Sequence, residues 1–229
     1  VKPRGGAAPY LGGKRLLSKK IVGKIEHVPH ATYAEAFVGM GGVFFRRNYR
    51  PRQEVINDYG REVANFFRVL QRHYVAFLDM MKFQLSVRAE FERLRQTDPA
   101  TLTDLERAAR FYYLQNLAFG GNPHHSSFGI SIGYPARFDI TRLGSHLEEI
   151  HSRLSGVIVE NLSFEEFIPK YDSGDTLFYF DPPYWDGESD YGEGLFEKQD
   201  FDELAGLLRD MKGKFLLSIN DKPQIRDKF

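Results

Sequence analysis

Hydrophobic residues in the first third of the chain recur with the periods of alternating strands and helices. Short apolar runs bounded by polar or glycine residues are typical of buried strands, and apolar residues spaced i, i+3, i+4 and i+7 are typical of a half-buried helix. These criteria predict strands over residues 31–37 and 54–57, helices over residues 17–25 and 61–72, and the start of a helix at residues 43–45. This alternating order favours a parallel α/β sheet.

The same pattern returns near the end of the chain, after a different middle segment. Strands are predicted over residues 157–160, 176–180 and 215–219, and a helix over residues 200–211 with Asp200 as its N-cap. Residues 74–120 are helical in pattern and include a capping box from Thr103 to Glu106, whereas residues 120–138 lack periodicity. We interpret residues 1–72 and 151–229 as one discontinuous α/β domain, interrupted by a mostly helical insertion over residues 73–150.

Composition excludes several classes of protein. The 229 residues include no cysteine, which excludes disulfide scaffolds, cysteine-ligated metal sites and thiol catalysis. No apolar run reaches the roughly 18 residues of a membrane span. The basic start lacks the apolar region of a signal peptide, so a cytoplasmic protein of bacterial or phage type is expected.

The net charge is zero, but the charges are unevenly distributed. Residues 1–60 hold eleven Lys and Arg against four acids, and residues 172–210 hold twelve acids against two basic residues. A basic first part suits a phosphate backbone. Ordinary solvated surface explains the same asymmetry, so charge alone assigns no partner.

A glycine loop follows the first predicted strand. Gly39 and Gly41 allow close approach of a ligand to the backbone, and Asp58 follows 19 residues after Gly39, at the end of the next strand. A carboxylate at that distance can accept both hydroxyls of a ribose, so a nucleoside cofactor is indicated. Phe44 occupies the position of the third glycine of dinucleotide-binding loops, which argues against NAD. A glycine turn without any ligand remains an alternative.

The tetrapeptide Asp181-Pro182-Pro183-Tyr184 follows the apolar strand at residues 176–180. Two prolines stiffen the backbone and remove two N–H donors, which leaves the Asp181 carboxylate and the Pro182 carbonyl as fixed acceptors. An exocyclic amine such as adenine N6 carries two hydrogens that these acceptors can hold, so its nitrogen can be turned toward an electrophile. Tyr184 offers a flat face on which a base can stack. The alternative is a proline-rich strand exit with a core tyrosine.

Together and in this order, the motifs resemble the Dam-type (class alpha) DNA adenine-N6 methyltransferases, which depend on S-adenosylmethionine. The resemblance covers nearly the whole chain. The matching segments are Tyr-Leu-Gly-Gly-Lys at 10–14, Glu-Ala-Phe-Val-Gly-Met-Gly at 35–41, Asn-Asp at 57–58, Asp-Pro-Pro-Tyr at 181–184 and Ser-Ile-Asn-Asp at 218–221.

The resemblance implies a Rossmann-like methyltransferase sheet with helices on both faces, and a target-recognition domain in the insertion. It implies that Asp181, Pro182, Pro183 and Tyr184 are catalytic and hold an adenine flipped out of double-stranded DNA, whose N6 attacks the methyl carbon directly. It also implies a set of residues around S-adenosylmethionine, with Lys14 paired to its carboxylate end. This set is Tyr10, Lys14, Phe37, Gly39, Gly41, Asp58 and Asp181.

The motifs define the residues that would contact DNA less sharply than those that would bind the cofactor. The candidates in the insertion are Arg107, Arg110, His124 and Ser126. Residues 119–129 depart from the corresponding segment of the best-known members, so no recognition sequence is carried over. Members usually continue through another strand after the one at residues 215–219, so the sheet is expected to lack a strand. A monomer without a bound metal is expected.

Three other functions remain open. A methyltransferase with the same chemistry could act on ribosomal RNA adenine, cytosine N4 or a glutamine amide. A non-catalytic DNA-binding relative could retain the fold, although the intact tetrapeptide argues against it. A nicotinamide-dependent oxidoreductase has only the glycine loop in its favour.

Overall fold

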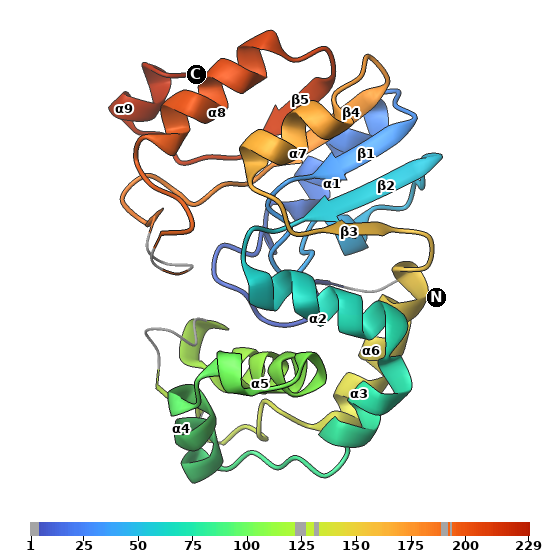
Figure 1. Ribbon diagram of the computed structural model, residues 1–229, viewed down its shortest axis with the longest axis vertical. Coiled ribbons are helices and arrows are strands. Elements are labelled where there is room, and N and C mark those ends of the chain that lie inside the picture. Colours follow the sequence, from blue (N-terminus) through green and yellow to red (C-terminus); the bar gives the residue numbers. More distant parts are fainter. Residues whose placement is uncertain (1–4, 122–126, 131–132, 189–191, 193) are drawn as a thin grey trace.

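The computed structural model describes residues 5–121, 127–130, 133–188, 192 and 194–229. Its centre is a five-stranded parallel sheet in the order β3-β2-β1-β4-β5 (Figure 1). The strands are β1 Thr32–Glu35, β2 Gln53–Asn57, β3 Ile158–Glu160, β4 Thr176–Phe180 and β5 Lys214–Leu217. Every strand predicted from the sequence is present, and the α/β class is confirmed.

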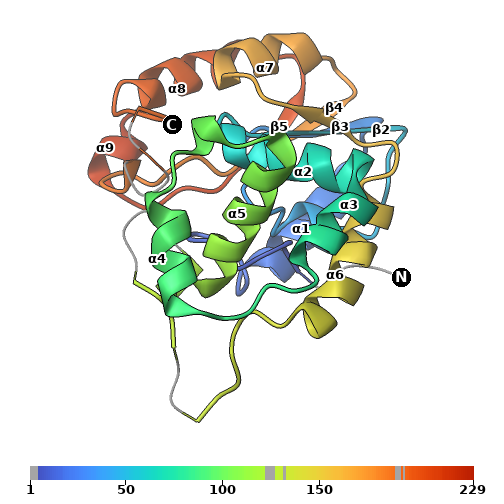
Figure 2. The ribbon, with the colours of Figure 1, turned by 60° about the horizontal axis from the view of Figure 1, so that its bottom comes forward.

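Helices cover both faces of the sheet because alternate residues of each strand point to opposite sides. Tyr33 and Ile56 belong to the core beneath α1 Ser18–His27 and α2 Arg61–Arg72. Ala34 and Val55 belong to a second core beneath α7 Phe164–Tyr171 and α8 Asp200–Asp210. Figure 2 shows α7 and α8 on one side of the strands and α1 and α2 on the other. A short helix, α9 Pro223–Arg226, ends the chain.

The insertion is helical and packs against α2. Its helices are α3 Tyr74–Met81, α4 Arg88–Gln96, α5 Asp104–Leu117 and α6 Ile140–Arg153, with 3₁₀ turns at Pro99–Thr101 and Phe119–Gly121. Phe66 of α2 stacks on Tyr112 of α5 with ring centroids 5.4 Å apart. One hydrophobic core therefore runs from the sheet into the insertion. The predicted capping box of Thr103 and Glu106 is present.

Two local predictions were wrong. The helix expected after the glycine loop is only a 3₁₀ turn, Phe44–Arg46, because Arg47 is already extended and its guanidinium is drawn into the core by Glu54. Asp200 does not cap α8; Gln199 holds the cap position, and the Asp200 carboxylate accepts a hydrogen bond from the Glu197 N–H instead.

Helices α6 and α7 lie where the sequence predicted no helix. α6 lies where the sequence suggested only the end of an insertion, and α7 connects β3 to β4. In the part of the chain that the structure describes, no helix is both long and apolar enough to traverse a bilayer.

Candidate active site

A cavity of about 840 Å³ opens at the carboxyl ends of β1 and β4, where the order of the strands reverses. Ligands of open parallel sheets bind at such a reversal, and small-molecule sites typically measure about 300–1,000 Å³. The N-terminal loop 5–15 and the glycine loop 37–43 line much of the cavity. Asp58, Tyr59, Gly60 and Val63 line it after β2, and Asp181, Pro183, Leu195 and Phe196 line it after β4. The insertion contributes Phe111, Gln115, Asn116, the turn 119–121, Arg137, Leu143 and His146.

Asp58 is held at the wall of the cavity by backbone N–H groups. Gly39 N–H donates to its Oδ2 at 2.9 Å, and Gly60 N–H donates to its Oδ1 at 2.9 Å. Burial raises the pKa of Asp58 to about 6, although these two hydrogen bonds oppose the rise. The carboxylate that the sequence assigned to a ribose is thus fixed in orientation and retains free acceptor positions, since each carboxylate oxygen can accept more than one bond.

The two glycines of the loop are required by close packing. Gly39 and Gly41 have φ of +49° and +70°, in the left-handed region that favours glycine. A Cβ on Gly39 would lie 2.5 Å from the Tyr10 ring, and one on Gly41 would lie 2.3 Å from the Phe45 ring. The loop therefore brings bare backbone against Tyr10 at the cavity wall.

Asp181 lies at the opposite side of the glycine loop, at the end of β4. Lys14 Nζ approaches its Oδ1 to 2.6 Å, and Lys14 Nζ also lies 4.5 Å above the centre of the Tyr184 ring. Burial raises the pKa of Asp181 to about 6, with Lys14 opposing the rise. Burial acts against the charge of Lys14 too, but Asp181 outweighs it, so the pKa of Lys14 is raised. Lys14 is thus an ion-pair partner of Asp181 here.

The tetrapeptide is fixed from both ends. Ser218 N–H donates to the Phe180 carbonyl at 2.9 Å, which continues the pairing of β4 with β5. The Asn220 side chain forms two hydrogen bonds with the backbone of Trp185, the residue after the tetrapeptide. Trp185 N–H donates to Asn220 Oδ1, and Asn220 Nδ2 donates to the Trp185 carbonyl, each at 3.0 Å. Pro182 and Pro183 are buried between these anchors. The Asp181 carboxylate and the Pro182 carbonyl therefore sit on a stiff corner.

Residues 10–229 match the family model of the D12 class N6 adenine-specific DNA methyltransferases. The chain belongs to this family. Family membership identifies it as an adenine-specific DNA methyltransferase, an enzyme that takes a methyl donor and acts on DNA.

Individual members of the family are only distantly similar. The Type II methyltransferase M.CviBI of Paramecium bursaria Chlorella virus NC1A is 25% identical over 201 residues, which is 86% of this chain and 76% of the viral protein. The Type II methyltransferase M1.LlaDCHI of Lactococcus lactis subsp. cremoris is 26% identical, over 74% of this chain and 66% of the relative. The DNA N-6-adenine-methyltransferase of Escherichia phage P1 is 28% identical, over 84% of this chain but only 27% of the phage protein.

The sequence analysis missed Phe164, Phe196 and Asn161, which lie at this D12-class site. Phe37 is flanked by Phe164 and Phe196, whose ring centroids lie 6.0 and 5.8 Å away. Phe37 lines both the main cavity and a smaller neighbouring cavity of about 260 Å³, Phe164 lines the smaller one, and Phe196 lines the main one. Asn161 follows β3, and its Nδ2 donates to the Asp58 and Tyr59 carbonyls at 2.8 and 3.1 Å. A polar residue at the end of β3 was the available signal, since that strand lies beside β2.

Glu35 is a second buried carboxyl at the cavity wall. It is 2% exposed, and the Tyr33 hydroxyl donates to its Oε2 at 2.8 Å. Burial raises the pKa of Glu35 to about 8, and the nearby Asp181 adds to the rise. Glu35 is therefore mainly protonated at neutral pH, whereas Asp181 is mainly ionised.

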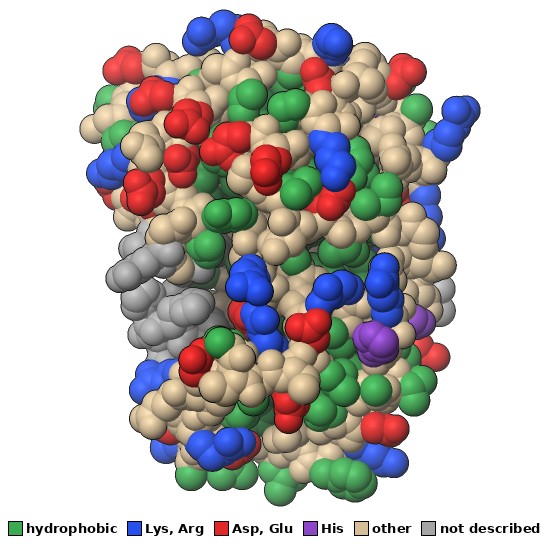
Figure 3. Space-filling view, viewed as in Figure 1, with side chains coloured by type: hydrophobic (Ala, Val, Ile, Leu, Met, Phe, Trp, Pro, Cys, Tyr) green, Lys and Arg blue, Asp and Glu red, His purple; other side chains and the backbone are tan. Residues whose placement is uncertain are grey.

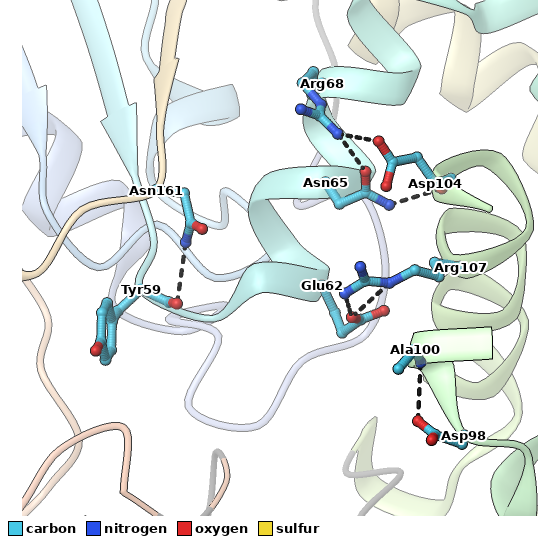
Figure 4. A network of polar contacts seen from close by, with 9 residues as sticks. All are labelled: Tyr59, Glu62, Asn65, Arg68, Asp98, Ala100, Asp104, Arg107 and Asn161. Carbon is cyan, nitrogen blue, oxygen red and sulfur yellow. Dashed lines mark hydrogen bonds and ion pairs between the residues drawn. The ribbon is translucent and has the colours of Figure 1, made fainter. Parts of the chain in front are cut away.

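The candidate DNA contacts have partners within the protein. Arg107 forms an ion pair with Glu62 of α2, with its Nε 3.2 Å from Glu62 Oε1 (Figure 4). Arg110 donates to the Leu94 and Arg95 carbonyls at the end of α4, at 2.7 and 3.3 Å. Contact of either arginine with DNA stays a prediction. His124 and Ser126 lie outside the described residues.

Other cations lie closer to the cavity. Arg15, Arg46 and Arg137 line it, and the sequence analysis assigned none of them a role. On the face drawn in Figure 3, Lys and Arg side chains form a band across the middle, where α2 exposes Arg61, Arg68 and Arg72, and acidic side chains gather over α7 and α8. Arg61, Arg68 and Arg72 lie outside the basic segment at residues 1–60, so this band of the surface has a different origin from the charge asymmetry of the sequence.

Proposed function

We propose that this protein transfers the methyl group of S-adenosylmethionine to N6 of an adenine that is rotated out of double-stranded DNA. The observation that carries the proposal is the position of Asp181: an ionised carboxylate beside a rigid proline corner, at the wall of the cavity that also holds Asp58 and the glycine loop.

The residues at the cavity fit S-adenosylmethionine. Asp58 suits a ribose diol, the backbone at Gly39 leaves no room for a side chain, and Phe37 provides an apolar face for an adenine ring. A pyrophosphate would need the amino end of a full helix, whereas only the 3₁₀ turn Phe44–Arg46 follows the loop. This difference favours S-adenosylmethionine over NAD. When bound, S-adenosylmethionine supplies a methyl carbon on positively charged sulfur, the electrophile of the reaction.

The protein's own groups position the nucleophile. We expect the two N6 hydrogens of the everted adenine to bind the Asp181 carboxylate and the Pro182 carbonyl, which turns the nitrogen lone pair toward the methyl carbon. Lys14 keeps Asp181 ionised, and Tyr184 gives the purine a stacking face worth about 1–3 kcal/mol. Eversion of the base itself costs a few kcal/mol, which these contacts offset.

The insertion over residues 73–150 is the target-recognition part of this proposal, and residues 1–72 and 151–229 are the catalytic part. The cavity-lining cations Arg15, Arg46 and Arg137 are proposed to approach the DNA backbone around the everted base, together with the arginines of α2. A monomer suffices, because one chain supplies every group named here. Light scattering of the protein with and without DNA tests this stoichiometry.

The decisive experiment is methylation of unmodified DNA by the purified protein, followed by nucleoside mass spectrometry. We expect N6-methyladenine to form, and the Asp181→Ala variant to lose at least about a hundredfold in rate, on the scale of removing a fixed stabilising group. A circular dichroism spectrum equal to that of the wild type controls for folding. Formation of N4-methylcytosine, or near-normal activity of Asp181→Ala, would contradict the proposal.

A further inference from the structure

We propose that Gln115, on the insertion helix α5, is a positioning residue that holds the N-terminal loop against the glycine loop and so sets the affinity of the cavity for S-adenosylmethionine. The inference rests on the proposed function and extends it, because it makes binding of the methyl donor depend on the part of the chain assigned to target recognition.

The first observation is the amide of Gln115. This side chain is 1% exposed, and its Nε2 donates both to the Pro9 carbonyl, at 2.7 Å, and to the Gly121 carbonyl. Pro9 precedes Tyr10 in the N-terminal loop, and Gly121 closes the turn that follows α5. One buried side chain thus joins two loops that are 112 positions apart in the sequence.

The second observation is the close packing around this amide. A Cβ on Gly121, whose φ is +74°, would lie 3.0 Å from both Pro9 C and Tyr10 N, so the turn rests directly on the backbone of the N-terminal loop. On the other side of that loop, the Tyr10 ring rests on the backbone of Gly39. Gly39 in turn donates to Asp58. A continuous series of contacts therefore runs from α5 through Tyr10 to the carboxylate proposed to bind the ribose.

Lys14 has a separate anchor. Its ion pair with Asp181 holds the far end of the N-terminal loop from the strand β4, independently of α5. Loss of the Gln115 amide would therefore release Pro9 and Tyr10 but leave Lys14 at the catalytic carboxylate. We expect weaker binding of S-adenosylmethionine with little change in the rate of methyl transfer. If only a fraction of the molecules has the loop in its binding position, the apparent Kd rises by the inverse of that fraction.

The chain provides a matched control in Gln71 of α2. Its Nε2 also donates to two backbone carbonyls, those of Leu154 at 2.9 Å and Val157 at 2.8 Å, but it does not line the cavity. Replacing either glutamine by leucine removes two amide–carbonyl hydrogen bonds, from a fully buried side chain in Gln115 and from a partly buried one in Gln71. Only Gln115→Leu would release the loop that carries Tyr10.

The experiment compares the intact protein with Gln115→Leu and Gln71→Leu by calorimetric titration of S-adenosylmethionine without DNA, steady-state kinetics on DNA, and thermal unfolding. For Gln115→Leu we expect Kd and KM for S-adenosylmethionine to rise about tenfold, as loss of two hydrogen bonds allows, with kcat within about threefold. Gln71→Leu should also lower Tm, because it removes two hydrogen bonds, and should leave Kd unchanged. Gln115→Met, which keeps an unbranched side chain of similar length but has no N–H donors, should reproduce the Kd change if the leucine variant does not fold.

Equal changes in Kd for both glutamine variants, or a lower kcat with unchanged Kd for Gln115→Leu, would overturn the inference. Failure of the proposed function would appear differently, as absence of N6-methyladenine with the unsubstituted protein.

Discussion

Lys14 Nζ lies 2.6 Å from Oδ1 of Asp181, and both side chains are largely shielded, at 7% and 17% exposure. Each group stabilises the charged form of the other in surroundings that would otherwise favour neutrality. Lys14 comes from the N-terminal loop and Asp181 from the end of β4, so the pair also joins two parts of the α/β sheet region that the insertion separates in the sequence. This ion pair leads to the first prediction.

Removal of Lys14 should move the acidic limb of the pH–rate profile upward. The pKa of Asp181 is about 6, so the intact enzyme should lose activity as the pH falls through about 6 and the carboxylate becomes protonated. Lys14→Met removes the cation that opposes this protonation, so the limb should move to higher pH. The measurement is kcat against pH at saturating S-adenosylmethionine, with Lys19→Met on the exposed side of α1 as control. An unshifted limb would show that Lys14 does not govern the charge of Asp181.

Binding of the methyl donor should weaken in acid because of Asp58. Burial raises the pKa of this carboxyl to about 6, so protonation below that pH removes acceptors for the ribose hydroxyls. We expect Kd for S-adenosylmethionine, measured calorimetrically, to rise as the pH falls from 7 to 5. Asp58→Asn should bind weakly at both pH values and lack this dependence, whereas Asp181→Asn should keep it. A pH-independent Kd in the intact protein would count against the ribose assignment.

Tyr184→Ala should weaken capture of the everted base. The Tyr184 ring is partly exposed and close to Lys14 at the proline corner, and loss of a stacking face costs about 1–3 kcal/mol. Fluorescence of 2-aminopurine placed at the target position measures the everted fraction, which should fall. Tyr49→Ala, at an exposed position before β2, is the control. Equal fluorescence in both variants would exclude stacking on Tyr184.

Asn220→Ala should lower kcat while leaving binding of the methyl donor unchanged. This amide holds Trp185 by two hydrogen bonds and so anchors the corner that presents Asp181. A displacement of the corner by about 1 Å would reduce the rate by about 10- to 100-fold. The control is Asp221→Ala, which affects an exposed ion pair with Arg226. A normal kcat for Asn220→Ala would mean that the prolines alone fix the corner.

Glu54→Ala should destabilise the fold strongly. Glu54 accepts from Arg47 at 2.9 Å and from Arg153 at 2.6 Å, and these arginines are 0% and 3% exposed. The substitution leaves two buried guanidinium groups without their anion, so the free energy of unfolding should fall by about 3–5 kcal/mol. Urea unfolding measures the change. Glu90→Ala, which breaks an exposed pair with Arg93, should cost no more than about 1 kcal/mol.

The sequence predicted the strands well because each carries its own local signal. The run at residues 176–180 is mostly apolar because β4 is buried on both faces, and the helical period of apolar residues in α2 matches its single buried side. The 3₁₀ turn at Phe44–Arg46 was not predicted, because the apolar residues there favour a helix and the local pattern does not show the ion pair of Arg47 with Glu54 on β2. Asp200 is not the N-cap of α8, because its carboxylate accepts a hydrogen bond from the Glu197 N–H, which precedes the helix.

By itself, the sequence determined the class of sheet and indicated the residues that we propose to carry the chemistry. The glycine loop and the tetrapeptide are contiguous segments whose backbone restrictions are local, so they can be recognised without a structure. Tertiary structure alone decided which groups meet: Lys14 with Asp181, Gln115 with Pro9, and Arg107 with Glu62. The physical reason is that contacts between segments far apart in the chain depend on how complete helices and strands pack, and no short pattern of residues encodes that packing.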